Sequence, residues 1–177
     1  MLRTILTFGV IAGLIVSANF VVVLVLPSLQ HHNSLIYGYL VMLVALSMVF
    51  LAIKRHRDRN LGGVIRFLPA LGVGLGVSAV AGVIYAAGWE VSLAATHYAF
   101  ADDYSAAMIN AARAKGASPA HLAEVVAQMQ AFKIQYANPL YRLPMTFVEI
   151  FPVGVVISLV SAALLRNSRF LPARAAA

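Results

Sequence analysis

Residues 54–89 read KRHRDRNLGGVIRFLPALGVGLGVSAVAGVIYAAGW, a basic run followed by a long apolar stretch. Between Phe67 and Trp89 the only strongly polar side chains are Ser78 and Tyr85. An apolar stretch of about 20 residues is long enough, as a helix, to cross a hydrocarbon core of ~30 Å. Basic loops stay on the cytoplasmic side of a membrane. The stretch therefore predicts a membrane span and fixes the direction in which the other spans cross.

The composition of the whole chain is that of an integral membrane protein. Of its 177 residues, 62% are hydrophobic and 11% are charged, and the mean hydropathy is +0.87. The formal net charge of +7 comes from basic residues that flank apolar stretches, which favours anionic lipid headgroups over nucleic acid as their partner. The absence of cysteine excludes disulfides and thiolate metal sites.

The apolar stretches predict one all-α membrane domain over residues 1–177, a four-helix bundle. A passable signal-peptide cleavage site ends at Ala18, but the apolar run continues to Leu26, so we expect an uncleaved signal anchor. Pro144 suits the first turn of the last span. The expected spans are about 4–26, 35–53, 67–90 and 144–165, with a basic loop at 54–66 and a long interval at 91–143.

Lys and Arg are distributed unequally between the two sides of the predicted bundle. Four lie in the long interval, and nine lie on the side of the termini, which predicts cytoplasmic termini and an extracytoplasmic interval. The four are Arg113, Lys115, Lys133 and Arg142. The nine are Arg3, Lys54, Arg55, Arg57, Arg59, Arg66, Arg166, Arg169 and Arg174, of which those at 54–66 are the candidate headgroup contacts.

The long interval has the helix start and stop signals of a helical hairpin. Apolar residues recur every three or four positions on both sides of Gly116, Ser118 and Pro119, which offer a helix stop, an N-cap and a first-turn proline. No Pro or Gly lies between Val91 and Lys115, so the first hairpin helix is expected to continue the third span. The pair either closes on itself or lies flat on the membrane surface.

Small residues recur every fourth position on three of the expected spans, a pattern that lets helix backbones approach closely in lipid. Two interpretations stay open: tight packing within a monomer, or a homo-oligomer that uses one stripe. The third span carries two stripes and can pack against two neighbours. The candidate packing residues are Gly9, Gly13, Gly72, Gly74, Gly76, Ser78, Gly82, Gly154 and Ser158.

Glu149 is a carboxylate inside the last span, and such residues are candidates for function. At 1.5 Å per residue it lies roughly 25 Å from the cytoplasmic flank, and Asn19, Tyr37 and Tyr85 reach the same depth. We expect these four residues to form an intramembrane polar cluster in which a hydroxyl or amide bonds the carboxyl. The alternative is a structural or headgroup-facing glutamate. Pro152 should kink the helix nearby.

Metal and catalytic sites find little support in the residue pattern. His31, His32 and His97, with Glu90, are the side chains able to meet near one membrane surface, and no metal motif spaces them. We therefore predict no metal, no cofactor and no enzymatic activity. Glu90 is interpreted as an interfacial charge, and Asp102 and Asp103 are interpreted as solvated.

The segment Arg57-Asp58-Arg59-Asn60-Leu61-Gly62-Gly63-Val64-Ile65-Arg66-Phe67 resembles a family of bacterial membrane proteins catalogued as domain of unknown function 4199. The opening Leu6-Thr7-Phe8-Gly9, the turn at 116–119, and Glu149 with Pro152 and Gly154 extend the likeness. The resemblance implies four helices in a bacterial inner membrane with the long loop in the periplasm, and it assigns no activity. Arg57 and Asp58 form either a loop-locking ion pair or a contact for a cytoplasmic partner.

These observations predict a non-enzymatic assembly or accessory subunit that interacts through its small-residue faces and its hairpin. The alternative is a small transporter or a lipid- or ligand-binding protein that uses Glu149. A membrane enzyme acting on lipid headgroups ranks third, since it needs a convergent polar site at the interface.

Overall fold

The computed structural model describes residues 1–25 and 35–173. Within these ranges the chain is all-helical and has no strand. Four of the described helices, α1, α2, α3 and α6, are long and apolar enough to cross a membrane. In order, the helices are α1 (Leu2–Val25), α2 (Leu35–Asn60), α3 (Phe67–Ala95), α4 (Phe100–Ala114), α5 (Pro119–Tyr136) and α6 (Pro139–Leu165).

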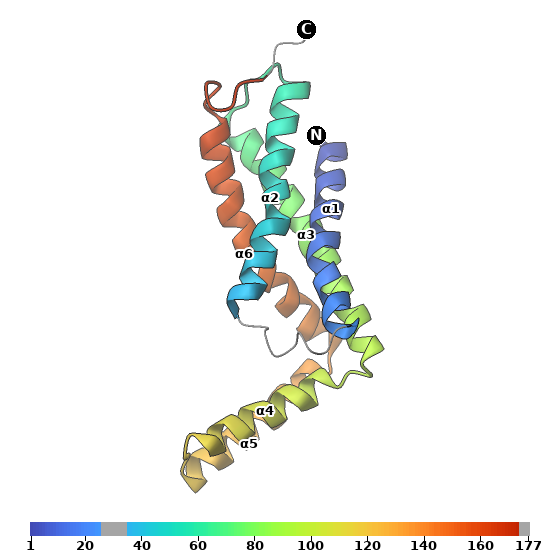
Figure 1. The fold of residues 1–177 in the computed structure, drawn as a ribbon, viewed down its shortest axis with the longest axis vertical. Helices are drawn as coiled ribbons and strands as arrows, with labels where there is room; N and C mark the ends of the chain where they lie inside the picture. The colour runs from blue at the N-terminus through green and yellow to red at the C-terminus, as the bar shows by residue number, and fades with distance from the viewer. Residues whose placement is uncertain (26–34, 174–177) are drawn as a thin grey trace.

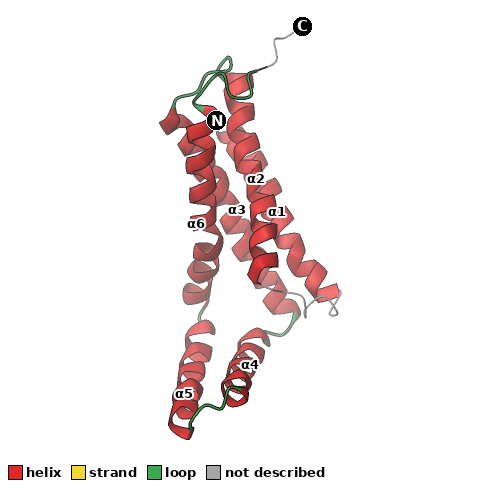
Figure 2. Cartoon of the chain, turned by 60° about the vertical axis from the view of Figure 1, so that its left-hand side comes forward, coloured by secondary structure: helices red, strands yellow, loops and turns green. Residues whose placement is uncertain are grey.

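The four long helices pack side by side, and α4 and α5 project beyond one end of them (Figure 1). Helix α3 has its most extensive contacts with α1 and α6. The start of α1, the α2–α3 connection and the end of α6 lie together at the opposite end (Figure 1). Figure 2 shows that α4 follows from α3 and that α5 leads back to α6. The two ends of the molecule therefore differ in kind, one basic and one formed by a hairpin.

Two of the expected boundaries shift in the structure. Helix α2 runs through most of the basic run to Asn60, because Lys and Arg are good helix formers, and the chain turns at Gly62 and Gly63 with φ of +63° and +88°. Helix α6 begins at Pro139, not Pro144, because the Asn138 side chain accepts a hydrogen bond from the Leu140 N–H at 3.0 Å. The basic loop is thus short, and the last span is long.

The expectation that the third span continues into the hairpin is wrong, since α3 ends at Ala95. His97 and Tyr98 adopt left-handed φ angles of +52° and +59°, which are uncommon outside glycine. The Tyr98 N–H donates to the Leu93 carbonyl at 2.7 Å, which satisfies the end of α3. The Arg142 guanidinium lies 5.2 Å from the Tyr98 ring centroid. Contacts from α6 thus hold a turn that the local residue types do not encode.

The hairpin turn forms at the residues that predict it. Gly116 has a φ of +74°, and the Ser118 hydroxyl accepts a hydrogen bond from the His121 N–H at 3.3 Å. Pro119 begins α5. The Tyr104 and Phe132 ring centroids lie 5.5 Å apart across the two helices. The hairpin therefore closes on itself through its aromatic stripes.

Small residues line the contact between α3 and α6, here called the α3–α6 seam (Gly74, Ser78, Gly154 and Ser158). Each glycine faces a serine of the other helix: a Cβ on Gly154 would lie 2.6 Å from Ser78 Cβ, and one on Gly74 would lie 2.7 Å from Ser158 Oγ. The two serine hydroxyls are 3.4 Å apart, and each also donates to a carbonyl of its own helix. The seam has no room for a methyl group.

The opposite face of α3 packs against α1 in the same manner. A Cβ on Gly9 would lie 2.5 Å from Val80 Cβ, and one on Gly13 would lie 2.6 Å from Ile84 Cβ. A Cβ on Gly76 would meet Ile5 at 2.9 Å, and one on Gly82 would meet Phe147 of α6 at 2.7 Å. A Cβ on Gly72 would meet nothing within 4 Å. Most of the small-residue positions are therefore occupied by contacts within the chain.

Candidate functional site

A cavity of about 600 Å³ lies where the long helices meet the hairpin. All helices except α2 contribute to its walls. We call it the junction cavity, and it is lined by Phe20, Tyr85, Trp89, Phe100, Tyr104, Met129, Phe132, Tyr136, Met145, Thr146 and Glu149. This volume lies within the range of small-molecule sites, which are mostly apolar with a few polar groups.

Aromatic rings form a continuous wall of this cavity. Phe20 of α1 contacts Tyr85 and Trp89 of α3, with centroids 5.1 Å apart in each case. Trp89 meets Phe100 of α4 edge-on at 5.0 Å, and Phe100 lies 5.5 Å from Tyr136 of α5. Such separations are those of favourable aromatic pairs. Among the described residues, this ring cluster has seven members: Phe20, Tyr85, Trp89, Phe100, Tyr104, Phe132 and Tyr136.

Glu149 provides the carboxylate of the cavity. The Tyr85 hydroxyl donates to Glu149 Oε2 at 3.2 Å, and the Glu149 side chain is exposed to the cavity and the molecular surface. Pro152 lies inside α6 and cannot donate to the carbonyl of Val148, and α6 changes direction along its length (Figure 1). The predicted hydroxyl–carboxyl contact is present, with Tyr85 as its donor.

Trp89 and Tyr136 connect α3 to the end of α5. The Trp89 indole N–H donates to the Tyr136 hydroxyl at 2.6 Å. Burial raises the pKa of the Tyr136 phenol, so its hydroxyl stays protonated and retains its own proton to donate. The cavity thus has a second polar group on its hairpin side.

A partly buried ion pair joins α3 to α6 beside the hairpin. Arg142 donates to both oxygens of Glu90, from Nε at 2.5 Å and from Nη2 at 2.7 Å. Its Nη1 donates to the carbonyls of Tyr136 and Ala137, each at 3.1 Å, which satisfies the end of α5. Glu90, interpreted as an interfacial charge, is thus paired with a buried arginine. The sequence pattern gave no signal that paired these two residues.

The four residues of the predicted intramembrane cluster occur as two hydrogen-bonded pairs. Besides the Tyr85–Glu149 pair, the Tyr37 hydroxyl donates to Asn19 Oδ1 at 3.0 Å on the surface between α2 and α1. Within the described lining of the junction cavity, Asn19 and Tyr37 do not appear, and Phe20 does. The depth of each residue along its helix predicted one layer for all four residues. Depth alone does not determine the direction in which each side chain points.

The basic end contains a buried arginine. Arg57 is fully buried and donates to Asp58 at 2.7 Å, to the Phe170 carbonyl at 3.0 Å and to the Leu171 carbonyl at 2.5 Å. It also reaches the Leu165 carbonyl at 3.4 Å, at the end of α6. This geometry favours the loop-locking interpretation of Arg57 and Asp58, and it directs the Arg57 charge into the protein rather than toward headgroups.

The other candidate headgroup residues are exposed or partly exposed. Arg55, Arg59 and Arg66 are exposed, and Lys54 is half-buried and pairs with Asp58 at 2.5 Å. The Arg55 guanidinium lies 5.9 Å from the centroid of the Phe8 ring. A recess of about 430 Å³ at this end is lined by Phe8, Leu51, Lys54, Arg55, Asp58 and Arg59.

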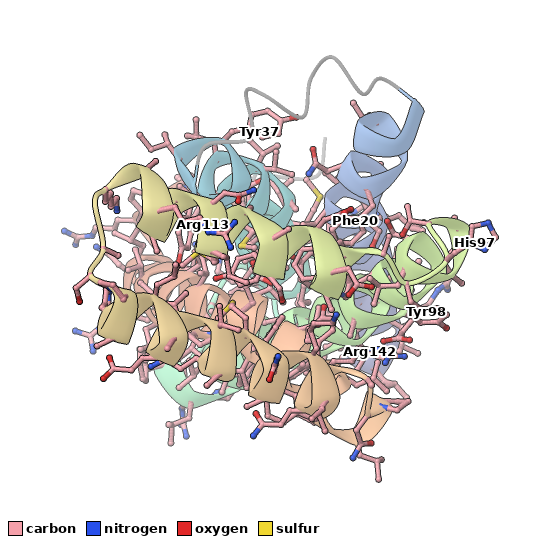
Figure 3. All side chains as sticks on the ribbon, turned by 90° about the horizontal axis from the view of Figure 1, so that it is seen from below. Phe20, Tyr37, His97, Tyr98, Arg113 and Arg142 are labelled. Carbon is pink, nitrogen blue, oxygen red and sulfur yellow. The ribbon has the colours of Figure 1, made fainter. Side chains whose placement is uncertain are left out.

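Of the residues weighed for a metal site, Glu90 and His97 lie in the part of the chain that is described. There, no group of three or more His, Asp or Glu side chains is arranged to hold a metal ion. His97 is exposed and points outward from the molecule (Figure 3). His31, His32 and Arg174 lie outside the described residues. Asp102, interpreted as solvated, is exposed and pairs with Lys133 of α5.

The chain belongs to the family described as protein of unknown function (DUF4199), whose profile matches residues 7–167. The match confirms the resemblance seen in the sequence, and it includes every residue that lines the junction cavity. No curated protein matches the chain, and no solved structure matches it.

Proposed function

We propose that this member of the DUF4199 family is a non-enzymatic protein of the bacterial inner membrane that binds an amphipathic small molecule or lipid in the junction cavity. The observation that carries the proposal is the composition of the cavity wall. Seven aromatic rings, Tyr85 among them, line the cavity together with Glu149, which is the pattern of an apolar site with a few orienting polar groups. Glu149 and Tyr85 are the polar end of this site.

The proposed topology places both termini in the cytoplasm and the α4–α5 hairpin in the periplasm, outside a four-helix bundle. Its support is the distribution of charge. The end that carries the start of α1 and the end of α6 holds most of the basic residues, whereas the hairpin side holds Arg113, Lys115, Lys133 and Arg142. In this orientation the junction cavity opens near the periplasmic surface of the membrane.

The test is mass spectrometry of the molecules that copurify with the protein in mild detergent. Met145 lines the cavity and is about half exposed, so Met145→Trp places an indole in the cavity without disturbing the buried core. Leu140→Trp is the matched control, because Leu140 lies on the same helix, is 83% exposed and does not line the cavity. We expect Met145→Trp to lose a bound species that the wild type and Leu140→Trp retain. An identical bound complement in all three proteins would contradict the proposal.

A second candidate function is assembly with another membrane protein. The hairpin supports it, because Ser105 is the buried residue of α4 and Tyr136 that of α5, while side chains such as Ile134 are 76% exposed. Exposed apolar side chains of this kind provide a surface for further contacts. A stoichiometric protein partner in native mass spectra, lost when Ile134 is replaced by Asp, would favour this function. A strict monomer in native membranes would oppose it.

A further inference from the structure

We infer that the junction cavity takes an organic cation, an ammonium group carried on an apolar body, with Glu149 as its counter-charge. This inference rests on the proposed function and names the class of ligand. It follows from three features of the cavity wall: its charge, its rings and its size.

The described wall of the cavity carries one acidic side chain and no basic side chain from the protein. Glu149 is its acidic residue, and the described lining contains no Lys, Arg or His. Across the described residues, none of the ion pairs includes Glu149. Arg142, two turns earlier on α6, is bonded to both oxygens of Glu90. A carboxylate in this position is therefore complementary to a cation supplied by a ligand.

The rings of the wall add to the attraction for a cation. The face of an aromatic ring carries negative potential, and Trp followed by Tyr gives the strongest attraction for ammonium groups. Trp89, Tyr85 and Tyr136 all line the cavity. An anionic head would meet the Glu149 carboxylate and these ring faces together. A purely apolar ligand would leave the carboxylate with the Tyr85 hydroxyl as its hydrogen-bond partner and without a counter-ion.

The size of the cavity indicates that the cation carries an apolar body. A volume of about 600 Å³ is larger than an ammonium head alone requires. Most of the remaining wall, including Met129, Met145 and Phe132, is apolar and suits an alkyl or aryl group. An ammonium-bearing lipid and a soluble amphiphilic amine share this chemistry.

The experiment measures binding by the fluorescence of Trp89, which is the single tryptophan of the chain and lies in the cavity wall. The full-length protein is placed in nanodiscs of an uncharged galactolipid, which has neither an ammonium group nor a net charge that would favour one probe. The probes are octyltrimethylammonium, octyldimethylphosphine oxide with a neutral head of similar size, and octanesulfonate with an anionic head. Glu149→Gln removes the charge from the cavity, and Glu124→Gln is the matched control on the exposed surface of α5.

We expect the wild type to bind the cation at least tenfold more tightly than the neutral probe, and the anion most weakly. Glu149→Gln should lose this tenfold preference and keep its affinity for the neutral probe, while Glu124→Gln should behave as the wild type. Equal affinities for cation and neutral probe, unchanged by Glu149→Gln, would overturn the inference and leave the proposed function standing. Absence of saturable binding by every probe would overturn both.

A second arm of the experiment identifies the source of the cation. Nanodiscs that contain phosphatidylethanolamine offer an ammonium headgroup to the cavity. A tenfold weaker apparent affinity for octyltrimethylammonium in these discs supports the inference and assigns the site to a lipid headgroup. An unchanged affinity, with the preference for the cation retained, supports the inference and assigns the site to a soluble amine.

Discussion

The α3–α6 seam and the ring cluster hold helices together by opposite means. In the seam, glycine and serine let two backbones approach until a single methyl group would not fit. In the ring cluster, seven large side chains fill the space between helices that stay further apart and leave the junction cavity among them. Lipid tails are as apolar as leucine, so close backbone packing drives association inside a membrane. Where large rings lie between the helices instead, a cavity forms.

The largest expected effect comes from filling the seam. Gly154→Leu places a side chain where a Cβ alone meets Ser78 at 2.6 Å, so it should lower the free energy of unfolding by about 3 kcal/mol or more. Gly72→Leu is the control, because that position is open, and its effect should stay within about 0.5 kcal/mol. Thermal unfolding in detergent measures both. An equal loss of stability in the two variants would show that α3 and α6 are not packed too closely in the seam to admit a side chain.

An intermediate effect is expected where the hairpin joins the long helices. Arg142→Met leaves Glu90 without its partner, and because the Glu90 side chain is 25% exposed the cost should be about 2 kcal/mol, below the ~3–5 kcal/mol of a fully buried pair. The double variant Glu90→Gln with Arg142→Met removes the unpaired charge. It should be more stable than Arg142→Met alone when both are measured by thermal unfolding. A double variant that is less stable would contradict the pairing, because Glu90 would then stabilise the protein without Arg142.

The smallest effect is expected within the hairpin. Lys133 and Asp102 form an ion pair between α5 and α4, with side chains 46% and 64% exposed. Exposed pairs contribute little, so Lys133→Ala should cost less than about 1 kcal/mol and should not change the melting temperature of the long helices. Amide hydrogen exchange confined to α4 and α5 would detect the change. Faster exchange in α3 or α6 would contradict the separation between the two regions.

Local residue patterns were sufficient for much of the fold. Apolar length predicted the four long helices, and Gly116, Ser118 and Pro119 predicted the hairpin turn, because each of these signals acts through its immediate neighbours. The spacing of small residues likewise predicted that α3 has two packing faces. These features need no knowledge of which helix lies beside which.

The candidate site was predicted only in part, because its contacts join residues far apart in the chain. The Tyr85–Glu149 contact was expected from helix depth, but Phe20 was not assigned to the site. The Glu90–Arg142 pair and the left-handed turn at His97 depend on how α6 packs against α3. No local sequence pattern predicts them. The roles of Phe20 and Arg142 depend on tertiary contacts, which the local sequence does not specify.

The α3–α6 seam also has a consequence for the biosynthesis of the protein. Ser78 and Ser158, which meet in the seam, are separated by 80 residues. At about 5–20 residues per second, the ribosome needs roughly 4–16 s to make the intervening chain. For most of that interval α3 is complete, while the part of α6 that packs against it has not yet been made. The order of synthesis therefore exposes a narrow glycine-lined groove to the lipid, and to the insertion machinery, before the helix that fills it exists.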